Sequence, residues 1–346
     1  MLSIVKDIPD FAISSQLDII IECDERMTFS LYKDKTVILQ ETYTPDFNNR
    51  IHIYDLFSLL EPYLLENPLC VFSYLCDAPN EWDQDPKFFT VLLCRHLIFS
   101  SANDFVNGYF LTPLAGRDKI TSFDRVETLY VTTGRTSSGG TSIPVNAECV
   151  FVSDSNEIYT SVRSLGSVSD YGINSIDVSP SRFTQSGYKL LRYTVTAGAR
   201  KQVYRLDHDE PDSIGIKFRN SFGCMETFYF IGTDKLEPEL TRSAAYFNGT
   251  YRTYHIDEQR KHTLSTGYIP ESMYTLVDDV ARSQEVYLID GSEEIPITII
   301  DSDTQRDTSN DGLFSFTITY ILSSRCQNRL KLLPDIFDDT FDDTYN

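Results

Sequence analysis

A short segment, residues 214–232, limits the fold of this chain more than any other feature of the sequence. In its first half Ile216 and Phe218 alternate with cationic residues, and in its second half Phe228 and Phe230 alternate with Thr and Tyr. Side chains on a β-strand alternate between two faces with this period of two. The compact Asn-Ser-Phe-Gly turn between the two runs contains no reactive arrangement of side chains. The segment therefore predicts a β-hairpin, which is a building element rather than a catalytic one.

Length and composition set the scale of the fold. At 346 residues the chain exceeds what one hydrophobic core usually organises, so two or three domains are expected. An apolar fraction of 41%, with 13% aromatic residues, is enough to fill such cores. From residue 125 onward, short apolar runs are separated by clusters of Gly, Ser and Asp, which is typical of sandwiches and barrels. We expect a mainly β protein with two or three β-sandwich-like domains and a few short helices.

Breaks in these patterns divide the chain into four parts. Residues 1–118 are expected to form an N-terminal β-rich domain with one short helix, and residues 119–210 a middle β domain with a Gly-rich loop at residues 133–140. Residues 211–334 are expected to form a C-terminal β domain with one helix, followed by an acidic tail at residues 335–346.

Local patterns locate the helices and one further hairpin. Apolar residues recur at helical spacing over residues 56–64 and again over residues 273–280. The pair Asn248-Gly249 lies between two aromatic-rich runs, and this is the strongest short-range signal for a tight hairpin turn.

The charge of the chain excludes several classes of partner. Lys and Arg number 30 against 51 Asp and Glu, which gives a formal net charge of −21. Nucleic-acid binding needs a basic surface, and anionic membranes repel an acidic one, so neither is expected as a partner. The sequence begins without the basic and then apolar segment of a secretory signal, and it contains no apolar run long enough to cross a bilayer. We therefore expect that the chain folds in a cytoplasm and does not insert into a membrane.

No motif indicates a cofactor, a metal or a catalytic centre. The seven cysteines are scattered among apolar residues without a C-x-x-C pair, which favours buried free thiols over a zinc site. The Gly-rich loop lacks the Gly-Lys-Ser/Thr ending of a phosphate loop, and residues 301–312 have Arg306 and Gly312 where a calcium loop has Gly and Glu. None of the five histidines lies in a nucleophile motif, although His208 beside an acidic cluster is the residue on which a hydrolase would depend. We expect no enzyme, no cofactor and no bound metal.

Functional residues are therefore expected at protein interfaces. The tandem Phe-Asp-Asp-Thr repeat at the C-terminus is first interpreted as a disordered acidic tail, and second as a peptide that inserts its rings into a neighbour. Trp82, the only tryptophan, lies in a polar loop, where it contacts protein on one interpretation and a sugar ring on the other. The interface candidates are Arg135, Asn220, Phe222, Asn248, Phe337 and Phe341, and Trp82 is the candidate glycan contact.

One stretch of the chain resembles structural tail proteins of tailed bacteriophages. The resemblance starts from Lys217-Phe218-Arg219-Asn220-Ser221-Phe222-Gly223-Cys224-Met225-Glu226-Thr227-Phe228-Tyr229-Phe230. It continues in the order of elements that follow and covers residues 214–330, about a third of the chain. It is a resemblance of pattern without a catalytic signature.

The resemblance implies a virion protein of the tail, baseplate or neck. Such a protein would assemble in the host cytoplasm with copies of itself and other tail proteins. The alternative is a receptor- or glycan-binding module at the tail tip.

Overall fold

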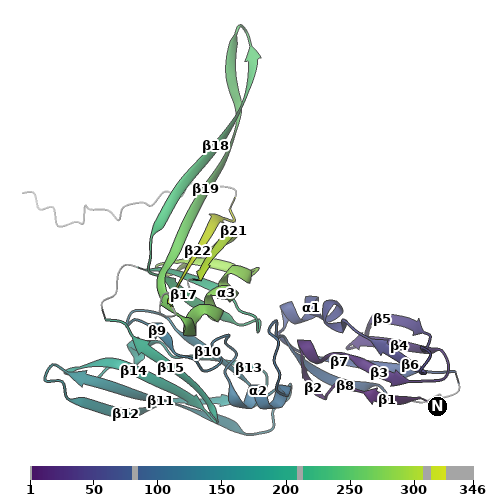
Figure 1. The fold of residues 1–346 in the computed structure, drawn as a ribbon. Coiled ribbons are helices and arrows are strands. Elements are labelled where there is room, and N and C mark those ends of the chain that lie inside the picture. The colour runs from purple at the N-terminus through teal and green to yellow at the C-terminus, as the bar shows by residue number, and fades with distance from the viewer. Residues whose placement is uncertain (1, 80–84, 209–212, 307–312, 325–346) are drawn as a thin grey trace, which may run out of the picture.

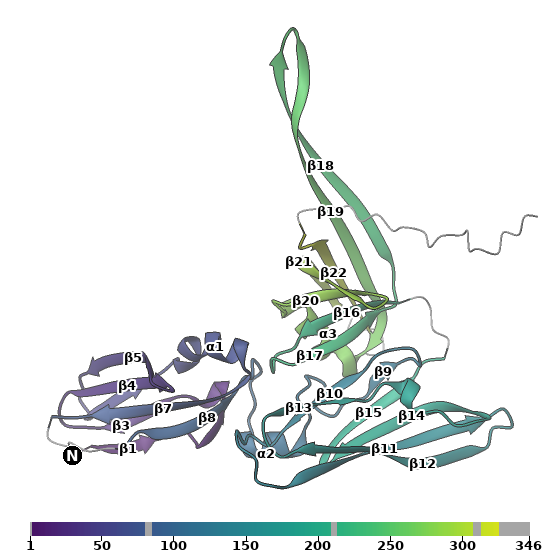
Figure 2. The ribbon, with the colours of Figure 1, turned by 180° about the vertical axis from the view of Figure 1, so that it is seen from behind.

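The chain is mainly β, as expected, with several sheets and a few short helices (Figure 1). The computed structural model describes residues 2–79, 85–208, 213–306 and 313–324. The N-terminal and middle parts of the chain lie side by side at the base of the molecule, and a long two-stranded ribbon projects away from that base (Figures 1 and 2).

The N-terminal unit contains two sheets and one helix. The strand order is β1-β3-β6 in one sheet and β2-β8-β7-β4-β5 in the other. The helix forms where the leucine spacing predicts it, and it buries Leu56, Leu60 and Leu64 in the core of this unit. The elements are β1 (Ser3–Lys6), β2 (Phe11–Ile13), η1 (Ser14–Gln16), β3 (Ile19–Glu22), β4 (Met27–Lys33), β5 (Thr36–Tyr43), β6 (Arg50–Ile53), α1 (Leu56–Glu66), β7 (Leu69–Asp77) and β8 (Lys87–Leu92).

The middle unit packs a five-stranded sheet and a two-stranded sheet around an aromatic core. The larger sheet has the order β12-β11-β14-β15-β9, and the smaller one pairs β10 with β13. Tyr193 and Tyr204 stack in the core with ring centroids 4.7 Å apart. The elements are α2 (Ala102–Gly108), β9 (Lys119–Thr121), β10 (Thr128–Thr132), β11 (Ser142–Ser153), β12 (Ile158–Ser169), β13 (Ile173–Asp177), η2 (Pro180–Arg182), β14 (Tyr188–Ala197) and β15 (Arg200–Leu206).

The C-terminal unit is one seven-stranded sheet with the order β17-β16-β20-β21-β22-β19-β18. The hairpin expected within residues 214–232 is confirmed as β16 (Ile214–Arg219) and β17 (Met225–Phe230). Helix α3 (Tyr274–Arg282) follows η3 (Glu271–Met273), and it buries apolar side chains in the core of this unit. The remaining strands are β18 (Asp234–Phe247), β19 (Thr250–Pro270), β20 (Val286–Asp290), β21 (Glu293–Arg306) and β22 (Leu313–Leu322).

A fourth apolar cluster joins the three units. It brings together Ile13 and Leu92 of the N-terminal unit, Phe105 of α2, and Phe222 of the turn between β16 and β17. The ring of Phe222 stacks on that of Phe105 with centroids 5.4 Å apart. The turn between β16 and β17 is therefore a point at which all three units meet.

The side chain of Asn220 holds this turn together. Its Oδ1 accepts hydrogen bonds from the backbone N–H groups of Phe222 and Cys224, both at 3.0 Å. Its Nδ2 donates to the carbonyl oxygen of Leu111 at 2.9 Å and to Glu226 Oε2 at 3.0 Å. Every donor and acceptor of the Asn220 amide is thus used inside the chain.

This geometry corrects the expectation that Asn220 and Phe222 contact a neighbouring subunit. Only 4% of Asn220 and 2% of Phe222 is exposed, so neither side chain is available to a partner. The prediction is wrong because the turn is covered by the N-terminal and middle units, a packing between distant segments that strand alternation cannot reveal.

Candidate interaction surface

The most prominent surface of the molecule is a projecting ribbon formed by the outer parts of β18 and β19. The two strands pair with each other from Asp234 opposite Leu264 to Phe247 opposite Thr250. Strand β19 also pairs with β22, but only from His262 to Pro270. We call residues 237–261, where the structure shows two strands and no third, the arm (Figure 1).

The tip of the arm forms where the sequence predicts a tight hairpin. Asn248 has φ 50° and Gly249 has φ 78°, the left-handed values that a two-residue hairpin turn needs at both central positions. Beside the turn, the rings of Tyr246 and Tyr251 meet edge to face at 5.1 Å. The predicted turn is confirmed, while a contact of Asn248 with a neighbour stays a prediction.

One face of the arm is charged and internally paired. Cross-strand partners share a face, and residues two apart along a strand lie on the same face. On the charged face Lys261 Nζ lies 2.7 Å from Glu239 Oε2, and Lys235 pairs with Glu237. The hydrogen bond from Lys261 lowers the pKa of the Glu239 carboxyl below its usual value. This face has the character of a solvated surface.

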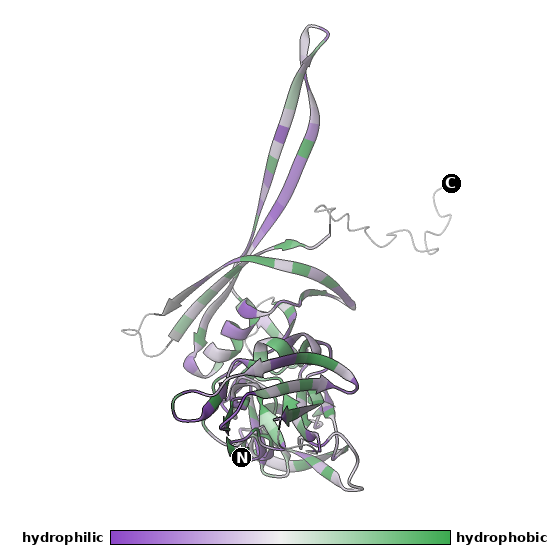
Figure 3. Cartoon of the chain, turned by 90° about the vertical axis from the view of Figure 1, so that its right-hand side faces the viewer, coloured by the Kyte–Doolittle hydropathy of each residue, from purple (hydrophilic) through white to green (hydrophobic). Residues whose placement is uncertain are grey.

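The opposite face of the arm carries exposed apolar side chains, and we call it the apolar face. It contains Pro238 and Leu240 on β18 and Ile256 on β19, and Leu236 continues it just below the arm; Arg242 and the ion pair between Arg260 and Glu258 lie on it as well. Leu240 is 43% exposed and Ile256 52% exposed. Figure 3 shows the ribbon as largely hydrophilic with separate hydrophobic bands along it. The arm therefore has the two-faced pattern of a half-buried sheet, without anything among the described residues covering its apolar face.

Such a ribbon is a typical site for binding another protein. An isolated two-stranded hairpin is marginally stable in water, and its outer edges carry backbone groups that are ready to pair with another strand. Exposed apolar surface rimmed by polar residues indicates an interaction site. A partner would both cover the apolar face and stabilise the arm.

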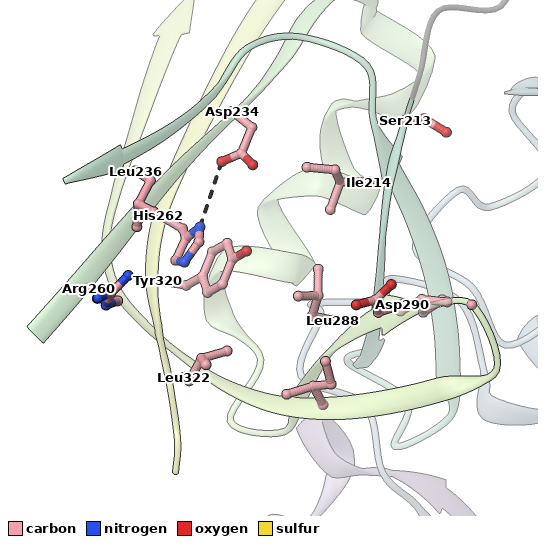
Figure 4. Close-up of a pocket in the computed structure, with 13 residues that line it drawn as sticks. Ser213, Ile214, Asp234, Leu236, Arg260, His262, Leu288, Asp290, Tyr320 and Leu322 are labelled. Carbon is pink, nitrogen blue, oxygen red and sulfur yellow. Dashed lines mark ion pairs between the residues drawn. The ribbon is translucent and has the colours of Figure 1, made fainter. Parts of the chain in front are cut away.

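A groove lies at the base of the arm on the same face. Its volume is about 500 Å³, and its apolar lining includes Ile214, Leu288 and Leu322 (Figure 4). The imidazole of His262 stacks on the ring of Tyr320 with centroids 5.0 Å apart. Burial raises the pKa of the Tyr320 hydroxyl well above its usual value. The groove is therefore an apolar depression with an aromatic wall.

Carboxylates and one guanidinium surround this apolar floor. Asp234 and Asp290 line the groove from opposite sides, and Arg260 lines it next to the arm (Figure 4). Arg260 Nε donates to Glu258 Oε1 at 2.6 Å, so its charge is balanced within the arm. Asp234 Oδ1 lies 3.8 Å from His262 Nδ1, beyond hydrogen-bond distance. The rim of the groove is acidic.

A second polar cluster, around Asp279 of α3, has the residue types of a hydrolase but the wrong order. Asp279 accepts hydrogen bonds from the Ser221 hydroxyl and from the Ser221 backbone N–H at 2.8 Å. His96 Nε2 lies 3.3 Å from the same carboxylate. The carboxylate thus lies between hydroxyl and imidazole, whereas a catalytic triad needs the imidazole between them. The cluster fastens α3 to the junction between the units.

Among the residues that the structure describes, no three His, Cys, Asp or Glu side chains are grouped so that they would hold a metal ion. None of the described helices combines the length and the apolar character needed to cross a membrane.

Other residues predicted from the sequence are spread over the surface. The guanidinium of Arg135 is 60% exposed and lies 3.1 Å from Asp170. The same carboxylate accepts a hydrogen bond from the Thr141 hydroxyl at 2.8 Å and holds the Gly-rich loop at Gly139, an anchor that the sequence analysis missed. His208 is exposed. Trp82, Phe337 and Phe341 lie outside the described residues.

The apolar face of the arm was missed because only its turn was recognised in the sequence. The signal was the alternation of Leu236, Pro238 and Leu240 with charged residues, which is the period of a strand with one covered face. Asn220 and Phe222 do not lie at this surface but at the junction between the units.

Comparison with known protein families found no match, and comparison with characterised proteins found none either. Two solved structures align over large parts of the chain with little similarity. One is the calcium-binding domain CBD12 of CALX1.1, with 9% identity, 57% of this chain and 79% of that chain covered, and a TM-score of 0.19. The other is from a 1.5-MDa bacterial ice-binding adhesin, with 8% identity and a TM-score of 0.16; the alignment covers 77% of this chain and 91% of that chain. At these scores neither likeness carries an argument about fold or function.

Proposed function

We propose that this chain is a structural subunit that assembles through protein–protein contacts, with the apolar face of the arm as its principal contact. The observation that carries the proposal is an exposed two-stranded ribbon with a charged, ion-paired face and an opposite face on which Leu240 and Ile256 are open to solvent. A chain that functioned alone would gain nothing from keeping such a ribbon in water.

Within this class, we propose a virion protein of a phage tail, baseplate or neck, assembled in the host cytoplasm with copies of itself and other tail proteins. The resemblance of residues 214–330 to such proteins supports this assignment, and that stretch includes the arm. The net charge of −21 also suits a structure along which DNA passes without binding.

Two adjacent residues of β18 allow a matched test of the arm. Leu240 faces Glu258 across the ribbon on the apolar face, and Thr241 faces Asp257 on the charged face. Leu240→Lys and Thr241→Lys therefore add the same cation beside a carboxylate in each case, but only the first places it on the proposed contact. Both sites are exposed, so neither change should unfold the chain.

The measurement is the mass distribution of the purified chain over a range of concentrations, by mass photometry, with negative-stain imaging of any oligomer. We expect Leu240→Lys to weaken association at least tenfold and Thr241→Lys to leave it near that of the wild type. A wild-type chain that stays monomeric at every concentration, or equal effects of the two variants, would contradict assembly of copies through the apolar face.

The second candidate is a receptor- or glycan-binding module at a tail tip. The observation that favours it is the group of exposed rings near the tip of the arm, where Tyr251 is 78% and Tyr254 73% exposed. Aromatic rings that project from a ribbon can stack on the apolar faces of sugars. Binding of the chain to a glycan array, lost in Tyr251→Ala and kept in Leu240→Lys, would favour this function over assembly.

A further inference from the structure

The groove at the base of the arm continues a face that is buried elsewhere in the same sheet. Beneath α3, Phe218, Val286 and Phe314 are buried, and the Phe314 ring lies 5.6 Å from that of Tyr274. Residues two apart along a strand share a face, so Ile214 and Leu288 lie on the same face of the sheet as Phe218 and Val286. At the groove this face extends beyond α3 and is not covered by it. An apolar sheet face of this kind needs a second layer.

The groove adjoins the point at which the described part of the chain ends. Leu322, the last residue of β22, lines the groove. Ser323 is fixed next to it, because its N–H donates to the carbonyl oxygen of Pro296 at 3.0 Å and its hydroxyl lies 2.8 Å from that of Thr298. Whatever follows Ser324 in the sequence therefore starts beside the groove.

The residues that follow match the groove in chemistry. Residues 325–334 read Arg-Cys-Gln-Asn-Arg-Leu-Lys-Leu-Leu-Pro and contain three cations, three leucines and no acid, in a chain of net charge −21. Residues 335–346, in contrast, contain five Asp and no cation. The groove offers an apolar floor with the carboxylates of Asp234 and Asp290 at its rim. Residues 325–334 therefore complement the groove in both polarity and charge. Residues 335–346 would instead place carboxylates next to the carboxylates of the rim, where they repel each other.

We propose that residues 329–333 of the chain dock in the groove of the same molecule, with Leu330 and Leu332 on its apolar floor and Arg329 and Lys331 next to Asp234 and Asp290. An extended chain advances about 3.3 Å per residue, so the four residues 325–328 span about 13 Å from Ser324. Such a short tether gives an effective concentration in the millimolar range. Docking would supply the second layer that α3 does not provide, and it does not involve Leu240 or Ile256 farther out on the arm.

Hydrogen exchange of the full chain, read by mass spectrometry, tests this proposal. We expect the amides of residues 329–333 to exchange at least tenfold more slowly than in an unstructured peptide, and those of residues 338–346 at the unstructured rate. Leu332→Asp should abolish that protection, while Phe337→Asp, outside the docked segment, should leave it unchanged. The protection of α3 serves as the check that the fold is intact.

A matched pair on the arm tests the groove from its other side. Leu236, at the rim, is 45% exposed and lines the groove, while its neighbour Glu237 lies on the charged face. Leu236→Lys should raise exchange of residues 329–333 to the unstructured rate, because it adds a cation where Arg329 and Lys331 bind, and Glu237→Lys should not.

The outcomes separate this proposal from the proposed function. Exchange of residues 329–333 at the unstructured rate in the wild type, or protection that survives Leu236→Lys, would overturn docking in the groove. Protection that grows with protein concentration would overturn docking within one molecule, because the occupant would be a second copy. Leu240→Lys should weaken association without changing this protection, so that either proposal can fail while the other holds.

Discussion

Replacement of Glu226 by Gln tests how the units are joined, because this carboxyl is buried where they meet. Only 4% of Glu226 is exposed. Its oxygens accept hydrogen bonds from the Thr112 hydroxyl at 2.9 Å and from Asn220 Nδ2 at 3.0 Å. Lys119 Nζ is 3.9 Å away, but it lies closer to Glu127, at 2.6 Å. One cation thus serves two buried carboxylates.

Burial raises the pKa of Glu226 to about 7, against the opposing effects of Lys119 and of the hydrogen bonds from Asn220 and Thr112. The folded state therefore holds a proton on Glu226 that the unfolded state releases near its ordinary pKa of 4.5. A pKa that is raised on folding contributes stability that is complete below 4.5 and lost as the pH rises through about 7. At about 1.4 kcal/mol per pKa unit, the full loss amounts to about 3–4 kcal/mol.

Gln keeps the size and shape of the Glu226 side chain and lacks its charge. Asn220 cannot rotate its amide, because its oxygen already accepts two backbone N–H groups, so it must keep donating to an oxygen of residue 226. The Thr112 hydroxyl can accept as well as donate, so it can accept a hydrogen bond from the Gln amide. Glu226→Gln therefore mimics the protonated carboxyl at every pH.

The assay is native-state hydrogen exchange of the amides of Phe222 and Cys224, which report opening of the turn at the junction. From pH 5 to pH 8 the free energy of opening in the wild type should fall by about 2–3 kcal/mol relative to Glu226→Gln, with most of the fall below pH 7 and a plateau above it. A difference between the two chains that stays constant from pH 5 to pH 8 would refute the reasoning.

Three further substitutions probe other contacts. Phe222→Ala removes the ring that stacks on Phe105, and we expect a loss of about 3–5 kcal/mol in the free energy of opening of the junction, measured by hydrogen exchange of the turn. Asp170→Ala removes the acceptor of the Gly-rich loop, and amides of residues 134–141 should then exchange at least tenfold faster while β14 is unchanged. Gly134→Ala places a Cβ 2.7 Å from the Phe11 ring at φ +78°, so it should lower the thermal midpoint by several degrees, and an unchanged midpoint by calorimetry would contradict this contact.

Local patterns of the sequence predicted much of the fold because they depend on neighbours along the chain. The alternation around the Asn220 turn, the leucines of α1 and the Asn248-Gly249 turn each specify an element within a few residues. Helix α2 and the short strand β9 were missed, because α2 is only seven residues long and β9 three. Elements of that length carry too little periodicity to be recognised.

The placement of functional residues could be predicted less well. Phe222 is an aromatic residue in a turn, and such residues are often exposed and available to a partner. In this fold, residues distant in the sequence pack over it and bury it. For the arm, the alternation from Leu236 to Leu240 predicts that one face of the strand is covered. It does not predict whether the same chain or another molecule covers that face. Sequence patterns specify which side of a strand is apolar, whereas the location of the covering layer is a property of the assembled fold.

The Asn220 turn also determines how the molecule transmits force. It is fastened to the N-terminal unit by the hydrogen bond from Arg95 N–H to the Ser221 carbonyl, and to α3 by Asp279. A load applied at the tip of the arm passes down β19 into the sheet and crosses β22, β21 and β20 before it reaches β16 and this turn. The angle between the arm and the rest of the chain is therefore set by contacts within the chain itself. If identical chains associate through their arms, each contact repeats the same rotation between neighbours, and that rotation determines whether a closed ring or an open helix forms.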